Sequence, residues 1–173
     1  MHWFNFFEWP KRDLGMFFIH GLVMVLVIAV FPFIIEEDAW HKAVISFGVM
    51  GALTFFMDSE IHVKPFRQQV WWGLIMAGQV VGACWVISLG PEEGSLSSSG
   101  HGLLLAPIMY LMMFAFDGLS KLLHGGHFRV LIPRREFPEG ASTKSKIWDG
   151  TFNVLALPIM LFIMFGIMAL TGQ

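Results

Sequence analysis

The 173-residue sequence is poor in charge and has only one cysteine. Charged side chains account for 14% of the residues, below the roughly 25% of ordinary soluble domains. Cys84 lies in an apolar run, so it excludes an internal disulfide and is expected to be a small core residue. Nucleophile motifs and a glycine-rich phosphate loop are also absent. The motifs therefore assign no reaction, and we expect no nucleic-acid partner.

Apolar residues dominate what is present. Hydrophobic residues make up 55% of the chain, with 18 Phe, 12 Met and 7 Trp. Uncharged runs of 17 or more residues recur, the length that a helix needs to cross about 30 Å of hydrocarbon. Because an unpaired backbone amide is very costly in lipid, helices are the expected way to span it. The sequence therefore predicts an all-α integral membrane protein, with residues 1–173 forming a single membrane domain.

Five apolar runs predict a bundle of five transmembrane helices. The second run is short, since only the 15 residues from Ala43 to Met57 lack charge. The first run is too long for the apolar region of a signal peptide and has no small-x-small cleavage site, so we interpret it as an anchor. The predicted spans are residues 16–35, 40–57, 68–89, 103–123 and 151–170.

Two segments outside these spans have a distinctive composition. The N-terminal stretch MHWFNFFEWPKR alternates aromatic and polar residues, which is typical of an interfacial segment at the headgroup level. The stretch 91–102, PEEGSLSSSGHG, is rich in turn-forming residues and predicts a loop without regular structure. The aromatic residues of the N-terminal segment are Trp3, Phe4, Phe6, Phe7 and Trp9.

Small residues recur at helical spacing inside the predicted spans. Gly48 and Ala52 in the second span, and Gly78 and Gly82 in the third, are four residues apart. Such pairs let two membrane helices approach closely, so we expect helix packing at both places. Gln79, in the middle of the third span, is expected to form a hydrogen bond to a neighbouring helix.

The distribution of basic residues predicts the orientation. With five spans, ten of the eleven Lys and Arg residues fall on one face of the membrane, together with the N-terminal arm and the segments 58–67 and 124–150. Lys42 alone falls on the other face. Because basic loops remain in the cytoplasm, the N-terminus is predicted to be cytoplasmic and the C-terminus outside, in the plasma (inner) membrane.

Histidines and carboxylates gather at the predicted cytoplasmic boundary, where they could bind Zn²⁺, Fe or Cu. Asp58 and His62 would share one face if the second helix continued that far. An ordinary structural role is the competing interpretation, because polar residues belong at span ends and Asp117 can pair with Lys121 one turn on. The candidate metal ligands are His20, Asp58, His62, Asp117, His124 and His127.

A haem is a second cofactor that this boundary could hold. Bis-histidine ligation needs two histidines at matching depth on different helices. His20 with His62 or His124 would meet that condition at the cytoplasmic edge. Among the candidate residues, His20 and Asp117 lie deepest in apolar runs, where an ionisable group is expensive and suggests function.

The second and fourth spans carry a series of short patterns. Around the second span these are the acidic pair Glu36 and Glu37, the Gly-Ala pair Gly51 and Ala52, and the ending Glu60-Ile61-His62-Val63. In the fourth span they are Pro107, Tyr110 and Gly118. In these patterns the chain resembles the small membrane subunit of TRAP transporters. It departs from that family in having five predicted spans instead of four, in lacking an arginine at the end of the first span, and in its reversed His-Ile order. The resemblance implies a non-catalytic scaffold for a larger transport subunit.

These observations lead to two functional hypotheses. The first is a non-catalytic, membrane-embedded subunit of a larger membrane complex without a cofactor, whose partners are larger integral membrane subunits and lipids. The basic 124–150 loop is then a candidate surface for anionic lipid or a cytoplasmic partner. The alternative is a metal-dependent membrane enzyme or an electron-transfer subunit that binds a metal ion or haem through the cytoplasmic histidines and carboxylates.

Overall fold

A computed structural model describes residues 9–57, 61–89, 95–128 and 143–170, and within these ranges the chain is helical without any strand. The first helix continues from its α-helical part into a π-helical segment and a 3-10 turn, and a second 3-10 turn precedes the third long helix. In chain order the elements are α1 Lys11–Val25, η2 Leu26–Val30, η3 Phe31–Phe33, α2 Glu37–Met57, η4 Ile61–Val63, α3 Phe66–Ser88, α4 Ser95–Leu103, α5 Leu105–His124 and α6 Thr143–Leu170.

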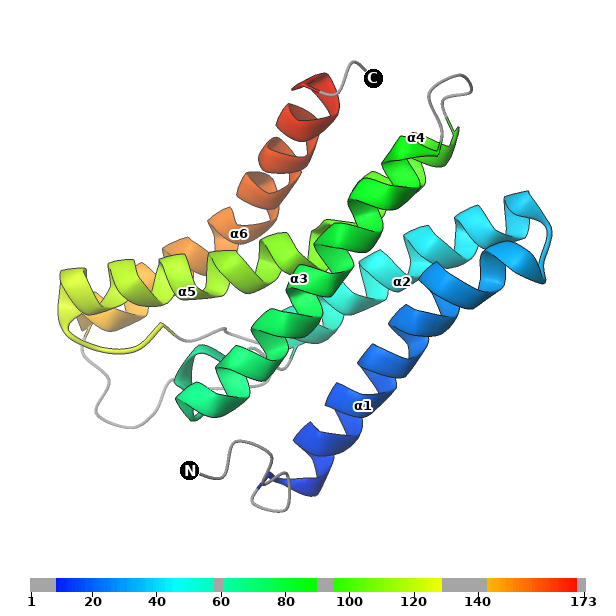
Figure 1. Ribbon diagram of the computed structural model, residues 1–173. Coiled ribbons are helices and arrows are strands. Elements are labelled where there is room, and N and C mark those ends of the chain that lie inside the picture. Colours follow the sequence, from blue (N-terminus) through cyan, green and yellow to red (C-terminus); the bar gives the residue numbers. More distant parts are fainter. Residues whose placement is uncertain (1–8, 58–60, 90–94, 129–142, 171–173) are drawn as a thin grey trace.

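The long helices run back and forth between two ends of the molecule. Figure 1 shows that α1 begins at the end where α2 finishes, where α3 starts and where α5 finishes. α6 runs from that end towards the opposite one and lies at the edge of the bundle, beside α5. The predicted basic end therefore brings together segments that are far apart in the sequence.

Four helical stretches in the described part of the chain are long and apolar enough to cross a membrane. The 21-residue α2 matches the second predicted span in position, but its crossing of the membrane remains a prediction, as does the orientation. The four stretches are Lys11–Phe33, Phe66–Ser88, Ser99–Leu123 and Lys146–Ile163.

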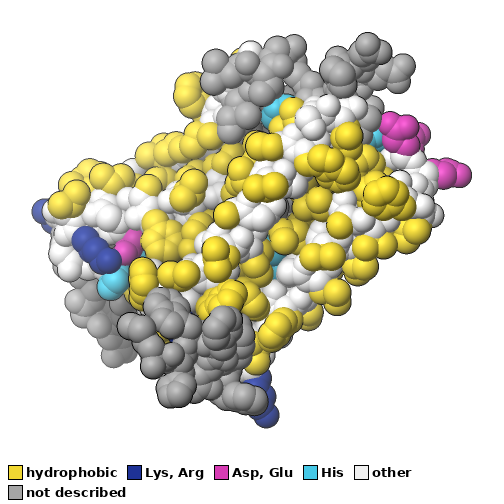
Figure 2. Space-filling view, viewed as in Figure 1, with side chains coloured by type: hydrophobic (Ala, Val, Ile, Leu, Met, Phe, Trp, Pro, Cys, Tyr) yellow, Lys and Arg dark blue, Asp and Glu magenta, His cyan; other side chains and the backbone are white. Residues whose placement is uncertain are grey.

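The outer surface of the helices is apolar. Figure 2 shows hydrophobic side chains over most of the visible face, with charged side chains confined to its two ends. Large apolar side chains on several helices are exposed, such as Phe18 on α1, Val81 on α3 and Leu111 on α5. An exposed apolar surface of this kind is compatible with a membrane protein, because lipid tails are as apolar as these side chains.

The prediction of a loop is wrong for residues 95–102, because Ser95–Leu103 form α4; residues 91–94 lie outside the described residues. Serine and glycine dominate this stretch, and short isolated helices of such composition are unstable in water. Here the helix is stabilised by packing, since Ser99, His101 and Leu103 are all buried and α4 lies against α2 and α3. The glycines allow this approach: a β-carbon on Gly100 would lie 3.0 Å from the carbonyl oxygen of Ala83.

Two other predicted boundaries need correction. α1 begins at Lys11, directly after Pro10, whose carbonyl oxygen accepts a hydrogen bond of 3.0 Å from the backbone N–H of Leu14. α6 begins at Thr143 and not at residue 151, so the predicted 124–150 loop is helical in its last part. In this added part of α6, Asp149 is fully buried, and its Oδ1 lies 3.4 Å from the Ser120 hydroxyl of α5.

The aromatic N-terminal segment is described only from Trp9 onwards, so Trp3, Phe4, Phe6 and Phe7 lie outside the described residues. Trp9 is buried within the protein, and the interfacial position of the segment remains a prediction. The Trp9 side chain is only 5% exposed and packs edge-on against Phe17 of α1, with ring centroids 5.2 Å apart.

A π-helical segment joins α1 to the start of α2. The wider π turn at Leu26–Val30 breaks the regular backbone ladder of the first helix. The indole Nε1–H of Trp40 donates a 2.8 Å hydrogen bond to the Val27 carbonyl oxygen. This buried bond fixes the chain reversal between the first two long helices.

Small residues allow the helix backbones to approach closely, as the sequence predicts for both pairs. Gly48 of α2 faces Gly102 of α4, and a β-carbon on Gly48 would overlap the Gly102 carbonyl oxygen. On α3, a β-carbon on Gly82 would lie 2.6 Å from Cδ1 of Ile28. Since Gly48 meets rigid backbone rather than a flexible side chain, it is the position with the least freedom to change.

We expect Gly48→Ala to lower the free energy of unfolding by roughly 1–3 kcal/mol, because the added methyl group must push α2 away from α4. Gly118→Ala is the matched control, since no atom lies within 4 Å of a β-carbon at Gly118. The control should be unchanged or slightly more stable, because alanine favours a helix over glycine. Unfolding of the purified variants in denaturing detergent measures both values, and equal losses would contradict the close approach.

Candidate functional site

Asp117 of α5 is the centre of a cluster of polar groups at the end of the bundle. Its side chain is buried, and the Lys121 ammonium lies 2.7 Å from Oδ2. Oδ1 accepts hydrogen bonds of 3.0 Å each from the Nδ1–H of His127 and from the backbone N–H of Phe128. Three donors therefore satisfy one buried carboxylate, which is the condition for burying a charge at acceptable cost.

The turn after α5 brings the last two donors back to Asp117. Gly125 has φ 76°, the left-handed conformation that only glycine adopts without strain, and its N–H donates to the Lys121 carbonyl oxygen. Gly125 and Gly126 thus end α5 in a bend. Reversal at this point places His127 and Phe128 over α5.

His62 joins this cluster from η4. Its Nε2–H donates a 2.8 Å hydrogen bond to the Phe128 carbonyl oxygen and lies 3.7 Å from Oδ1 of Asp117. Because a carbonyl oxygen can only accept, Nε2 must carry the proton. Two neighbouring side chains, Lys64 and Asp13, form an ion pair of 2.9 Å that ties η4 to the start of α1.

Burial lowers the pKa of His62 below its ordinary value of 6.5. The Phe128 carbonyl and the Asp117 carboxylate oppose this shift, whereas the neighbouring His127 and Lys121 add to it. His62 is therefore neutral at pH 7, and Lys121 supplies the positive charge that balances Asp117.

The structure brings together three of the six predicted metal ligands: His62, Asp117 and His127. In this arrangement Nδ1 of His127 donates to Asp117, Nε2 of His62 donates to the Phe128 carbonyl oxygen, and Lys121 lies on the other carboxylate oxygen. In the part of the chain that the structure describes, no three His, Cys, Asp or Glu side chains are arranged to hold a metal ion.

The other three predicted ligands are not in this cluster. Asp58 lies outside the described residues, and so does the side chain of His124. The expected shared face of Asp58 and His62 involves Asp58 and so lies outside the described residues; His62 itself belongs to the 3-10 turn Ile61–Val63. His20 lies elsewhere, among α1, α2 and α3, so the structure does not pair it with His62 as haem ligands.

His20 takes part in a second polar chain that crosses the bundle. Its Nε2 lies 3.1 Å from Oε1 of Gln79 on α3, and Nε2 of Gln79 donates a 2.8 Å hydrogen bond to the Leu103 carbonyl oxygen. All of these groups are buried. The prediction that Gln79 bonds to a neighbouring helix is confirmed, and α1, α3 and α4 are linked through one amide.

Sequence reasoning missed two further buried polar groups. Asp149 of α6 is fully buried, and the Ser120 hydroxyl of α5 lies 3.4 Å from its Oδ1. At the opposite end of the bundle, the buried His41 of α2 contacts the Ser99 hydroxyl of α4 at 3.0 Å. In the sequence, Asp149 and His41 each appear only as an ionisable residue near the end of an apolar run. That position does not show which helix will pack against the side chain.

Comparisons with protein-family models, curated proteins and solved structures found no match. The resemblance to the small membrane subunit of TRAP transporters therefore rests on the short patterns of the second and fourth spans alone.

We expect Asp117→Asn to lower the free energy of unfolding by roughly 1.5–3 kcal/mol, because hydrogen bonds to a charged group are lost and Lys121 keeps its charge. Asp38→Asn is the control, since Asp38 is exposed at the start of α2. Chemical unfolding monitored by circular dichroism measures the difference. Equal effects of the two substitutions would show that the buried cluster contributes nothing.

The lowered pKa of His62 predicts a pH-dependent stability. As the pH falls below 6.5, the unfolded state binds a proton that the folded state does not, so the free energy of unfolding decreases by up to about 1.4 kcal/mol per pH unit. This loss ends once the pH is below the pKa of the folded state. His62→Gln keeps a hydrogen-bond donor but cannot titrate, so its unfolding free energy should depend less steeply on pH; an unchanged slope would refute the assignment.

Proposed function

We propose that the chain is a non-catalytic, membrane-embedded subunit of a larger membrane complex, and that α6 beyond Pro158 packs against a helix of a larger integral membrane subunit. Transport is the process that the resemblance to the TRAP small subunit suggests. The observation that carries this proposal is the surface of α6, whose two halves differ in how they are covered.

The first half of α6 packs against its own chain. Asp149, Phe152 and Ala156 are buried and recur at spacings of three and four residues, which places them on one face of the helix. Beyond Pro158 the pattern stops: every described side chain from Leu161 to Ala169 is exposed. This second half is therefore a helix whose described apolar side chains are not covered by the rest of the described chain.

The exposed half of α6 has large and small residues along one face, as helix interfaces in membranes do. Phe162, Gly166 and Ala169 lie at i, i+4 and i+7, so a large ring and two small residues follow one another along one face. Phe162 is 79% exposed, and no atom lies within 4 Å of a β-carbon at Gly166. Small residues beside a large one favour the close approach of another helix, and close packing is what drives helix association in lipid.

The Asp117 cluster supports a structural role rather than chemistry. Its carboxylate is satisfied by Lys121, His127 and Phe128, and its histidines donate to groups of the same chain. These contacts join η4, α5 and the turn that follows α5.

Native mass spectrometry of the complex solubilised from its own membrane tests the proposal. We expect the wild-type chain to be held in a complex with a larger membrane subunit. Gly166→Trp should dissociate this complex, because the indole fills the small site on α6 without touching the rest of the described chain. Gly118→Trp is the matched control, since Gly118 is also exposed with no atom near its β-carbon, and it should leave the complex intact.

Two results would contradict the proposal. The first is a wild-type chain without a larger partner, or a complex that tolerates Gly166→Trp as well as Gly118→Trp. The second is a stoichiometric Fe, Cu, Zn or haem content that disappears in His62→Ala or Asp117→Ala. The second result would favour the metal-dependent enzyme or electron-transfer subunit.

A further inference from the structure

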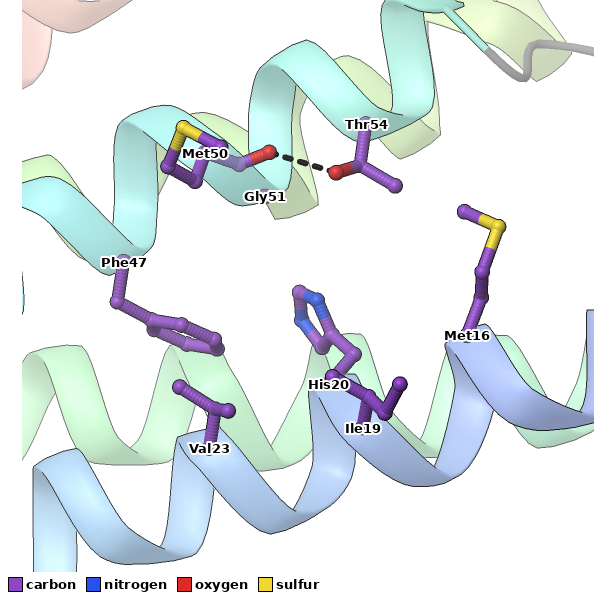
Figure 3. Close-up of a pocket in the computed structure, with 8 residues that line it drawn as sticks. All are labelled: Met16, Ile19, His20, Val23, Phe47, Met50, Gly51 and Thr54. Carbon is purple, nitrogen blue, oxygen red and sulfur yellow. Dashed lines mark hydrogen bonds between the residues drawn. The ribbon is translucent and has the colours of Figure 1, made fainter.

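A cavity of about 220 Å³ lies between α1 and α2. Ile19 and Met50 line it and are 64% and 61% exposed, so its mouth lies on the apolar outer surface of the bundle. Figure 3 shows Met16 of α1 and Thr54 of α2 at one end of the cavity and Phe47 at the other. A molecule that is dissolved in the membrane could enter from this side.

The wall of the cavity suits a hydrocarbon chain. Its two polar side chains have partners within the protein: Nε2 of His20 lies 3.1 Å from Gln79, and the Thr54 hydroxyl donates a 2.8 Å hydrogen bond to the Met50 carbonyl oxygen. Among the described residues, no charged side chain lines the cavity. An acyl chain that leaves the surrounding lipid for this wall gains only van der Waals contacts, so any selectivity must come from its headgroup.

A basic residue continues the lining face of α1 beyond the cavity. Arg12 lies four residues before Met16 and seven before Ile19, so it shares the helix face that lines the cavity. Its side chain is 68% exposed, and Lys11 beside it is exposed as well. Seven residues correspond to a rise of about 10 Å along the helix. A phospholipid whose phosphate lies beside Arg12 can therefore place an acyl chain in the cavity.

The acidic neighbour of Arg12 does not cancel this positive charge. Asp13 is buried, and its Oδ2 lies 2.9 Å from the ammonium of Lys64. Nε of Arg12 lies 3.8 Å from Oδ1 of the same carboxylate. One carboxylate thus faces two cations, and Lys11 adds a third positive charge. An anionic group beside Arg12 is electrostatically favoured at this end of α1.

The opposite end of the α1–α2 pair carries the opposite charge. Glu36, Glu37 and Asp38 are exposed there, and they outnumber the exposed Lys42. Figure 2 shows acidic side chains at the end where α2 begins and basic side chains at the end where α1 begins. An anionic headgroup is therefore attracted to one end of the pair and repelled from the other.

We infer that the cavity between α1 and α2 holds an acyl chain of an anionic phospholipid, whose phosphate contacts Arg12 and Lys11. Anionic lipids are attracted to basic residues at the end of a membrane span, which is where these two residues lie. The inference rests on the membrane embedding in the proposed function. It is independent of the proposed packing of α6, because α6 contributes no residue to the described lining of the cavity.

Native mass spectrometry of the purified full chain in detergent, titrated with dioleoyl phosphatidylglycerol or dioleoyl phosphatidylcholine, tests the inference. The two lipids have the same acyl chains and differ in the net charge of the headgroup. We expect one tightly bound phosphatidylglycerol per chain, with a dissociation constant at least about tenfold lower than that of phosphatidylcholine.

Neutralising the basic pair tests the position of the headgroup. The double variant Lys11→Gln/Arg12→Gln should weaken binding of phosphatidylglycerol about tenfold and leave binding of phosphatidylcholine nearly unchanged. Lys144→Gln/Lys146→Gln is the matched control, because it removes the same charge from two exposed positions at the start of α6. This control should bind phosphatidylglycerol as the wild type does.

Filling the cavity tests the position of the acyl chain. Thr54→Phe places a ring in the cavity, so it should weaken binding of both lipids at least about threefold through the loss of van der Waals contacts. Thr151→Phe is the matched control, because Thr151 is exposed on α6 and its hydroxyl makes the same 2.8 Å bond one turn back. Thermal unfolding verifies the fold of each variant, and the exposed basic pair still tests the inference if Thr54→Phe does not fold.

Three outcomes would overturn the inference. One is equal binding of the two lipids by the wild type, and another is a Lys11→Gln/Arg12→Gln variant that binds phosphatidylglycerol as tightly as the α6 control. The third is a folded Thr54→Phe variant that binds both lipids as tightly as Thr151→Phe. Gly166→Trp should keep the lipid even where it loses the larger subunit, so the two proposals can fail separately.

Discussion

The carboxylate of Asp117 forms the interaction on which one end of the bundle depends, because α5, the turn that follows it and the distant η4 all place groups around it. α5 supplies the carboxylate and Lys121, the turn after Gly125 supplies His127 and the Phe128 backbone, and η4 supplies His62. In an apolar surrounding an unsatisfied carboxylate would be very costly, so each donor must be in place for the others to be tolerated. The cluster therefore fixes where α5 ends and how η4 lies against it.

The same constraint explains the other buried polar groups. His20, Gln79 and the Leu103 carbonyl oxygen form one chain across α1, α3 and α4, and His41 with Ser99 does the same for α2 and α4. Between helices whose surfaces are as apolar as lipid, burial of apolar area gives little preference for one arrangement. Directed hydrogen bonds and close glycine contacts supply that preference.

The proposed interface lies outside this frame of hydrogen bonds. The second half of α6 makes no hydrogen bond to another helix among the described residues, and it presents an apolar surface with a small site at Gly166. A partner helix could therefore pack there without any change in the described fold.

The sequence by itself determined the helical class, the approximate positions of five long helices, the close packing at Gly48 and Gly82, and the pairing of Asp117 with Lys121. These features follow from local rules: the length of an apolar run, a helical spacing of four residues, and the cost of an unpaired amide in lipid. Only the tertiary structure decided that the serine- and glycine-rich stretch is α4, that Trp9 is buried, and that His62 and His127 meet at Asp117 while His20 binds Gln79. Each of these depends on which segments become neighbours after folding, and the order of residues along one helix carries no record of what lies across from it.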